Sequence, residues 1–141
     1  MKILVLNGPN LGRLGQREPE IYGTQTLADV ERMLLEVSKD RGCSIKFVQS
    51  NHEGQLIDWI ETQGHEADAI IINPGALAHT SLALADALRG SGKPVVEVHI
   101  SNVHRREEFR QRLLTAGAAV GVITGLGIEG YRLALDFLTR G

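Results

Sequence analysis

The feature that most constrains the fold of this chain is a regular alternation of short apolar runs with segments of helical periodicity. In the helix-like segments, apolar residues recur at the three- and four-residue spacing of a buried helix face. Strand-like runs occupy residues 3–6, 44–49, 69–72, 94–98 and 120–123. Helix-like segments occupy residues 26–41, the region around 56–60, and residues 81–89, 105–115 and 128–138. Five strands alternating with five helices predict a parallel sheet covered by helices on both faces.

Right-handed crossovers leave few topologies for such a sheet. The commonest at this size is an α/β, flavodoxin-like three-layer sandwich with a five-stranded parallel sheet in the order 2-1-3-4-5. The 141 residues fit one ordinary domain, and no repeat or linker divides them, so we expect a single domain over residues 1–141. The first long helix should begin at a variant capping box of Thr26 and Asp29 and end at Gly42.

Charge gives no case for a nucleic-acid or membrane-surface binder, because the net charge is -2 and the basic residues are mostly interleaved with acids. The exception is a short basic stretch containing Arg105, Arg106, Arg110 and Arg112. In the predicted helix, Arg106 and Arg110 lie one turn apart, where they would serve either a carboxylate or the helix surface.

The N-terminus and the cysteine content indicate the cellular compartment. Cys43 is the single cysteine, so an internal disulfide is excluded and a reducing compartment fits. The short apolar start lacks the features of a signal peptide, and no apolar run approaches the length of a membrane span. We therefore expect a soluble cytoplasmic protein.

Polar residues stand where the predicted strands end. Asn10 follows the first strand, Asn73 follows the third, and Glu97 and His99 close the fourth. Each has a plain structural explanation when taken alone, such as turn chemistry for the asparagines or a satisfied core histidine for His99. Ligands of this fold bind at the carboxyl ends of the strands, so the four residues together predict one ligand pocket.

The stretch from Gly8 to Gln25 has no strong period and is long for a compact domain, which is typical of functional loops. It contains Arg17 and Tyr22 and several glycines, and we interpret it as a lid over the strand ends. The alternative is a mobile surface loop with solvated charges.

Neither nucleotide fingerprint is present, because the glycines of residues 8–15 lack the dinucleotide spacing and no Gly-Lys-Ser/Thr follows. His79, Asp86, Glu97 and His99 are possible metal ligands, but their spacing matches no metal motif. The residues therefore support neither a nucleotide cofactor nor a metal.

Taken in order, the motifs resemble those of the type II 3-dehydroquinate dehydratases nearly from end to end. They are residues 7–12 (NGPNLG), 17–23 (REPEIYG), 49–54 (QSNHEG), 72–76 (INPGA), 79–81 (HTS), 97–102 (EVHISN), 125–127 (GLG) and 130–131 (GY). The resemblance implies a metal-independent hydro-lyase of the shikimate pathway, which converts 3-dehydroquinate to 3-dehydroshikimate by anti elimination through an enolate. It also implies trimers assembled into a homododecamer. Whether the chain serves biosynthesis or quinate breakdown stays open.

The resemblance further implies a role for each matching residue. Tyr22 would be the base, Arg17 would stabilise its phenolate, and Asn10 would hold a water near the enolate. His99 would be the general acid, with Glu97 orienting it. The positions matching substrate-binding residues are Asn73, His79, Ile100, Ser101 and Arg110, together with Asp86, which would reach the site of a neighbouring subunit.

These residue types suit the reaction. A proton must leave the carbon beside a ketone, and a tyrosine can take it only if a positive charge such as Arg17 stabilises the phenolate. Expulsion of hydroxide at neutral pH needs a proton donor, for which His99 is suited.

Some positions depart from the family pattern: Arg112 and Leu113 replace an expected His-Ser pair, Ala85 replaces a common Arg, and Gln55 replaces a common Glu. They bear on affinity and assembly more than on chemistry. Two other classes stay open from the residues alone: a different flavodoxin-like lyase or isomerase, and a response-regulator-like or flavin-binding module. The first would not explain Arg17 with Tyr22. A regulator would need an acidic cluster where Asn7 and Asn10 stand.

Overall fold

The computed structural model describes residues 1–16 and 18–140 of the chain. A sheet of five parallel strands has the order β2-β1-β3-β4-β5, which confirms the predicted flavodoxin-like topology. The strands are β1 (Lys2–Asn7), β2 (Ser44–Gln49), β3 (Ala69–Asn73), β4 (Val95–His99) and β5 (Gly121–Thr124). In the register, Asn7 lies beside Asn73, so these two polar strand ends are neighbours.

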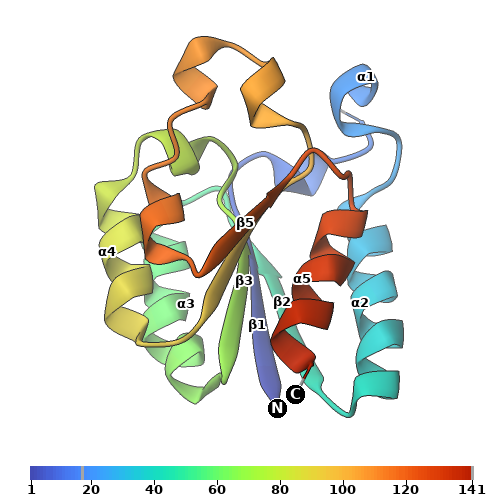
Figure 1. Ribbon diagram of the computed structural model, residues 1–141, viewed down its shortest axis with the longest axis vertical. Helices are drawn as coiled ribbons and strands as arrows, with labels where there is room; N and C mark the ends of the chain where they lie inside the picture. Colours follow the sequence, from blue (N-terminus) through green and yellow to red (C-terminus); the bar gives the residue numbers. More distant parts are fainter. Residues whose placement is uncertain (17, 141) are drawn as a thin grey trace.

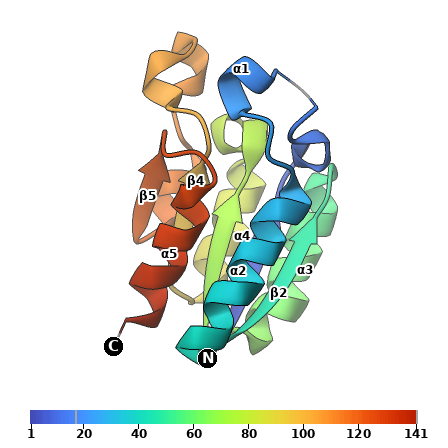
Figure 2. The same ribbon diagram turned by 90° about the vertical axis from the view of Figure 1, so that its right-hand side faces the viewer.

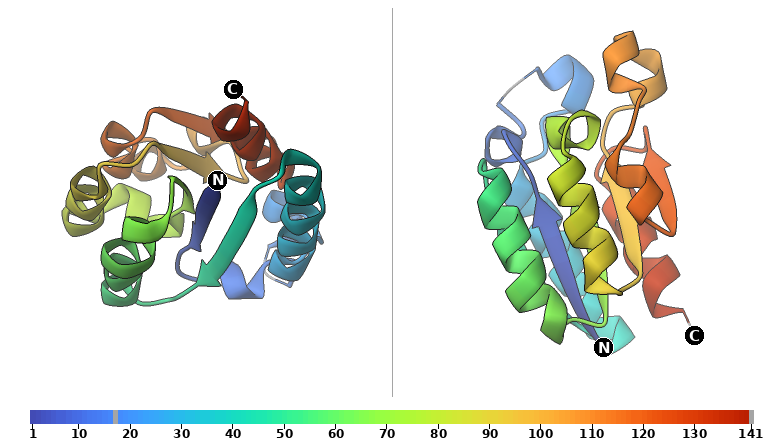
Figure 3. Two further views of the ribbon diagram at one scale, coloured as in Figure 1. Left: turned by 90° about the horizontal axis from the view of Figure 1, so that it is seen from below. Right: turned by 90° about the vertical axis from the view of Figure 1, so that its left-hand side faces the viewer.

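Long helices cover both faces of the sheet, giving the three layers seen in Figures 1 and 3. They are α2 (Leu27–Arg41), α3 (Glu53–Glu66), α4 (Leu82–Ser91) and α5 (Glu129–Thr139). Helices α2 and α5 contact each other on one face, and α3 and α4 do so on the other. The helices therefore leave the carboxyl edge of the sheet to the loops.

Short elements gather above the carboxyl ends of the strands, at the top of Figures 1 and 2. They are η1 (Leu11–Arg13), α1 (Pro19–Tyr22), η2 (Gly75–His79), η3 (Val103–Arg105) and η4 (Glu108–Arg110). Figure 2 shows α1 facing the segment that carries η3 and η4, although the two are far apart in the sequence. Residues 8–25, expected to lack regular structure, thus contain η1 and α1.

Each face of the sheet has its own apolar core. Along β1, Ile3 and Val5 pack toward α2 and α5, whereas Leu4 and Leu6 pack toward α3 and α4. Successive side chains of a strand point to opposite faces, so a strand covered on both sides must be apolar throughout. This explains why the central strands stood out in the sequence as continuous apolar runs.

The predicted capping box at the start of α2 is confirmed. Thr26 Oγ1 accepts a hydrogen bond from the Asp29 amide at 3.2 Å, and the Asp29 carboxylate accepts one from the Thr26 amide at 2.9 Å. The hydrogen bond from the Thr26 amide lowers the pKa of Asp29 below its ordinary value. Gly42 ends the helix with φ of 65°, a left-handed conformation that glycine adopts without strain.

The predicted amphipathic helix over residues 105–115 is wrong. The structure has η3, η4 and then η5 (Thr115–Ala118), separated by turns. Tertiary contacts override the local periodicity: the Leu114 amide donates to the Ala78 carbonyl at 2.7 Å, and Phe109, which the helix would have buried, is 66% exposed. The Gln111 side chain also donates to the carbonyls of His104 and Arg106, so these backbone groups are satisfied without a helix.

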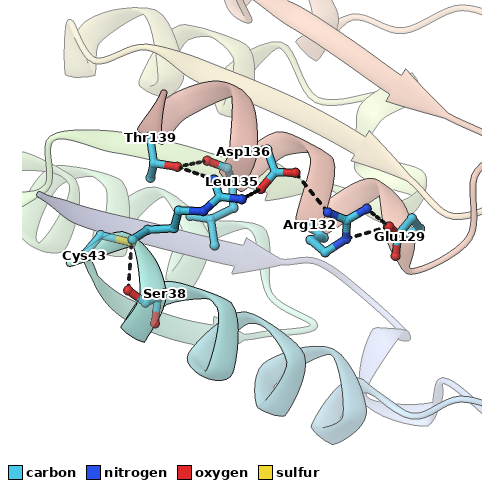
Figure 4. Close-up of polar contacts among 8 residues, drawn as sticks. Ser38, Cys43, Glu129, Arg132, Leu135, Asp136 and Thr139 are labelled. Carbon is cyan, nitrogen blue, oxygen red and sulfur yellow. Dashed lines mark hydrogen bonds and ion pairs between the residues drawn. The ribbon is translucent and has the colours of Figure 1, made fainter. Parts of the chain in front are cut away.

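Polar contacts tie α5 to the end of α2 at the opposite edge of the molecule (Figure 4). Arg132 pairs with Glu129 and, at 3.0 Å, with Asp136. Arg41 at the end of α2 reaches Asp136 at 2.5 Å and the Thr139 hydroxyl at 3.2 Å. The contacts of Arg41 join the end of α2 to the end of α5, whereas the pairs of Arg132 lie within α5.

Within residues 1–16 and 18–140, no helix has the length and apolar character needed to span a membrane.

Candidate active site

A pocket open to solvent lies at the carboxyl ends of β1, β3 and β4. This is the edge of the sheet where ligands of such folds bind. The pocket brings together eight of the predicted site residues: Asn10, Tyr22, Asn73, His79, His99, Ile100, Ser101 and Arg110. Its remaining lining residues are Pro9, Leu11, Leu14, Gly75, Ala76 and Arg106.

His99 stands at the end of β4 with Glu97 behind it. The imidazole Nε2 lies 2.7 Å from Glu97 Oε2, and the side chains are 6% and 0% exposed. An ionised carboxylate only accepts hydrogen bonds, so Nε2 carries the proton that they share. The other ring nitrogen, Nδ1, is therefore the one available to a ligand in the pocket.

The second oxygen of Glu97 accepts a hydrogen bond from the Thr115 hydroxyl at 2.5 Å. Thr115 begins η5 and is fully buried. A buried carboxylate needs such partners, because an unpaired charge away from water is strongly unfavourable. This contact was not predicted from the sequence, because residues 105–115 were interpreted as one helix.

Asn73 at the end of β3 is oriented by a buried network. Its amide Nδ2 donates to the Tyr131 hydroxyl at 3.0 Å, and the hydroxyl donates to Asn7 Oδ1 at 2.8 Å. The Gly75 amide donates to Asn73 Oδ1 at 3.1 Å. Burial raises the pKa of Tyr131 above its ordinary value, so this phenol stays neutral and keeps the proton that it donates. Tyr131 thus fixes Asn73 at the edge of the pocket.

His79 ends η2, and its ring stacks on that of His99 with centroids 6.4 Å apart. Its Nδ1 lies 3.0 Å from the backbone carbonyl of Arg112. A carbonyl cannot donate, so Nδ1 holds the proton, and Nε2 of the neutral ring is an acceptor. The departure from the family pattern at Arg112 therefore meets the site through the main chain.

Tyr22, the last residue of α1, contacts a cation. Arg106 Nη1 donates to the Tyr22 hydroxyl at 2.6 Å, and the guanidinium carbon lies 5.2 Å from the ring centroid. The same nitrogen lies 3.4 Å from Ser101 Oγ. The sequence offered Arg106 only as a partner for a carboxylate or the helix surface. Its contact with Tyr22 depends on the turn that replaces the predicted helix.

Asn10 lies at a left-handed turn with φ of 69°, a conformation that asparagine tolerates better than most residues. Asn51 Oδ1 accepts from the Asn10 amide at 3.0 Å, and Gln49 Nε2 donates to the Gly8 carbonyl at 3.2 Å. A Cβ at Gly8 would lie 2.4 Å from the Pro74 carbonyl oxygen, so the close approach of the β1 and β3 loops requires glycine here. The end of β2 thus helps to hold the turn that carries Asn10.

Arg110 at the end of η4 lines the pocket and donates from Nε to Glu107 at 2.6 Å. This hydrogen bond lowers the pKa of Glu107. Ile100 follows β4 and is buried, with its carbonyl accepting from the Gly127 amide at 3.1 Å. Both residues lie where the sequence predicted substrate contacts.

Two described residues of the predicted site do not line the pocket: Glu97 lies behind His99, and Asp86 lies on α4, beside a groove between α3 and α4, where it pairs with Arg89 at 3.6 Å. Arg17 lies outside the described residues. Over residues 1–16 and 18–140, no group of three or more His, Cys, Asp or Glu side chains could hold a metal ion.

The fold and the pocket together define a flavodoxin-like α/β protein that binds a small molecule at the ends of its strands. Comparison with known families makes this specific: the family described as Dehydroquinase class II matches residues 1–139, and the chain belongs to this family.

Individual relatives agree along the whole chain. A 3-dehydroquinate dehydratase from Variovorax paradoxus is 56% identical, over 97% of each chain. One from Herminiimonas arsenicoxydans is 57% identical, over 98% of this chain and 96% of the relative. A crystal structure of a type II dehydroquinase from Butyrivibrio crossotus superposes with a TM-score of 0.97 at 45% identity, covering 99% of this chain and 98% of that one.

Proposed function

We propose that this chain is a hydro-lyase that dehydrates 3-dehydroquinate to 3-dehydroshikimate in the shikimate pathway. Family membership and the printed activity of the relatives support the reaction. The observation that carries the mechanism is the presence, in one pocket, of a tyrosine against a cation and a histidine against a buried carboxylate.

Tyr22 acts as the base in this proposal. Its phenolate takes a proton from the carbon beside the substrate ketone, and the electron pair forms the enolate. An arginine about 4 Å from a phenolate attracts it by on the order of 4 kcal/mol at an effective dielectric near 20, before desolvation opposes the gain. Arg106 supplies such a charge at the Tyr22 hydroxyl, and Arg17 is proposed as a second stabilising cation.

His99 acts as the acid. The enolate expels the hydroxyl one carbon further on, the imidazolium donates its Nδ1 proton to it, and water leaves as the carbon–carbon double bond forms. Glu97 balances the positive charge of the imidazolium and keeps Nε2 occupied. Buried carboxylates orient catalytic histidines in the same way in other enzymes. The net change is loss of one water from the substrate.

The remaining pocket residues bind substrate and intermediate. Asn10 is proposed to hold a water at the enolate oxygen. Asn73, His79, Ile100, Ser101 and Arg110 are proposed to bind the hydroxyls and carboxylate, which their hydrogen-bonding groups and charges suit. Neither a metal nor an organic cofactor takes part in the proposed elimination.

A direct assay tests the proposed reaction. Purified protein mixed with 3-dehydroquinate should generate the ultraviolet absorbance of the enone product, and chelators should leave the rate unchanged. Borohydride should not inactivate the enzyme when substrate is present, because no imine forms. Absence of product, or inactivation that requires substrate, would contradict the proposal.

We also propose a cytoplasmic homododecamer, a tetramer of trimers, in which Asp86 completes the pocket of a neighbouring subunit. Nucleic acid and membrane are not partners. The position of Asp86 supports this assembly: it lies outside its own pocket and its side chain is 76% exposed. A group so placed can reach substrate only from another copy.

Complementation tests this assembly. Tyr22→Phe and Asp86→Ala proteins, each nearly inactive and each still oligomeric, are refolded together. Some mixed sites then combine an intact Tyr22 with an intact Asp86 from a neighbour, so activity should return. If mass measurement confirms mixed oligomers and no activity returns, Asp86 serves its own chain.

A further inference from the structure

Glu97 is a buried acid whose two oxygens have different partners. Oε2 lies 2.7 Å from His99 Nε2 and Oε1 lies 2.5 Å from Thr115 Oγ1. Glu97 and Thr115 are both 0% exposed. Within the described part of the chain these are the hydrogen-bond partners of the carboxylate, and His99 is its one ion-pair partner. Both contacts therefore satisfy the polar atoms of a carboxyl group that is removed from water.

The main chain around Thr115 is fixed independently of its side chain. The Leu114 amide donates to the Ala78 carbonyl at 2.7 Å, and the Val120 amide donates to the Val95 carbonyl at 2.8 Å. These bonds anchor the start of η5 to η2 and the residues after η5 to β4. The hydroxyl of Thr115 is therefore presented to Glu97 by a backbone that is already held.

The direction of this hydroxyl distinguishes Thr115 from threonines in the helices. The hydroxyls of Thr62 and Thr139 donate to the carbonyl four residues earlier, at 2.8 and 2.7 Å, which is an ordinary local contact. The hydroxyl of Thr115 instead donates its single proton to the carboxylate of Glu97, eighteen residues away in the sequence. A hydroxyl has one proton to donate, so this contact determines its orientation.

We propose that Thr115 is a positioning residue for His99 that acts through Glu97. By holding Oε1, it fixes the rotamer of the carboxylate and leaves Oε2 for Nε2, so Nδ1 is the nitrogen directed to the pocket. It also stabilises the anion that balances the imidazolium. This inference rests on the proposed role of His99 as the acid.

The test compares Thr115→Val, which keeps the shape but removes the donor, with Thr115→Ser, which keeps the donor. Thr115→Val should lower kcat with little change in KM, because substrate still binds. Outer partners of metal-bound histidines typically contribute about 10- to 100-fold to function, and by analogy we expect a loss in this range for His99. Thr115→Ser should restore most of kcat. An unchanged kcat in the Val variant, or equal losses in both variants, would overturn the inference.

A double-mutant cycle separates action through Glu97 from general packing. In a Glu97→Gln background, Thr115→Val should reduce kcat far less than it does in the wild type, because the charged group that Thr115 supports is already gone. Equal reductions in both backgrounds would mean that Thr115 acts by another route, and the inference would be wrong. Thr139→Val, far from the pocket, is the matched control for loss of a threonine hydroxyl and should retain wild-type kcat.

Two further measurements keep the outcomes distinct. If Thr115→Val does not fold, Thr115→Cys replaces it, because a thiol is a weak donor, and the same loss of kcat relative to Thr115→Ser is expected. His99→Ala is measured in parallel. An active His99→Ala enzyme contradicts the proposed role of His99 as the acid, whereas an inactive one with normal kcat in the Thr115 variant contradicts only the positioning role.

Discussion

His99 ends a central strand, 5% exposed, against two residues that are fully buried, whereas Tyr22 ends a four-residue helix and is only partly buried. We refer to Glu97 and His99 of β4, together with Thr115 of η5 that is hydrogen-bonded to Glu97, as the β4 end. We refer to residues 18–25 as the α1 segment. The β4 end is fixed by the sheet and by hydrogen bonds between buried groups. The α1 segment lies above the strand ends and faces η3 and η4.

In the proposed mechanism, this difference gives one pocket a proton donor that is fixed by the sheet and a base that lies on a separate segment. The proposed acid needs a set tautomer and a balancing charge, which a rigid buried site provides. The proposed base must approach a carbon atom of the bound substrate, and a segment outside the sheet can be repositioned without disturbing the core. Substitutions at the β4 end should therefore alter the rate of the chemical step while the shape of the pocket stays constant. Substitutions in the α1 segment should alter both the rate of the chemical step and the shape of the pocket.

The largest effect is expected for Tyr22→Phe. Loss of a positioned general base typically reduces the rate by on the order of 100-fold or more, and the phenyl ring preserves the shape of the residue. Turnover should fall by at least this factor while substrate binding, measured by calorimetry, stays nearly intact. A variant that keeps more than roughly a tenth of the wild-type rate would exclude Tyr22 as the base.

His99→Ala should lower kcat by about 100-fold and change KM much less, since the ring serves the leaving group more than the bound ground state. Steady-state kinetics separates the two parameters. A raised KM at constant kcat would assign His99 to binding and remove the β4 end from proton transfer.

A smaller loss is expected at the contact between Arg106 and Tyr22 of the α1 segment. Hydrogen bonds to charged groups contribute about 1.5–3 kcal/mol, so Arg106→Gln should lower kcat by roughly 10- to 100-fold. Arg106→Lys keeps the charge and should lose less than Arg106→Gln. Equal losses in the two variants would show that the geometry of the guanidinium, and not its charge, supports Tyr22.

Tyr131→Phe probes the support of the pocket beneath both regions. Removal of the hydroxyl leaves buried amide groups of Asn7 and Asn73 unpaired, which destabilises a protein by about 1–3 kcal/mol. We expect a lower Tm together with a raised KM, because Asn73 loses its fixed orientation. A Tm unchanged from wild type would show that the network is dispensable for folding.

The smallest effect concerns the capping box, where the α1 segment joins α2. Hydrogen bonding lowers the pKa of Asp29 in the folded state, so its contribution to stability is present above the unfolded value and is lost as pH falls through the folded one. Asp29→Asn should therefore have a lower Tm than wild type near pH 7, and the difference should shrink below about pH 4. A difference independent of pH would assign the effect to packing.

Much of the fold was readable from the sequence because burial on both faces makes each central strand a continuous apolar run. The start and end of α2 were equally clear, since capping residues and a terminal glycine act locally. Residues 105–115 were misread because their periodicity suits a helix, and only the distant Ala78 carbonyl and the side chain of Gln111 favour separate turns. Local sequence patterns do not reveal such contacts, which form only in the folded chain and override helix propensity.

The residues of the site also fall into those that the sequence could predict and those that it could not. Asn10, Asn73, Glu97 and His99 could be expected at one edge because strand ends converge in a parallel sheet. The contacts of Thr115, Arg106 and Tyr131 depend on chain segments far apart in sequence, so no spacing rule reveals them. The proposed role of Asp86 depends on a second copy of the chain, because this residue lies outside the pocket of its own subunit.

The hydrogen bond between His79 and the carbonyl of Arg112 has an evolutionary consequence. Every amino acid carries that carbonyl, so position 112 can exchange its side chain without removing the acceptor. The side chain at position 112 can therefore change during evolution while His79 keeps its hydrogen bond to the main chain and hence its tautomer. This contact of the pocket is in this way insensitive to sequence drift at position 112, where Arg112 supplies the acceptor of His79 through its main chain.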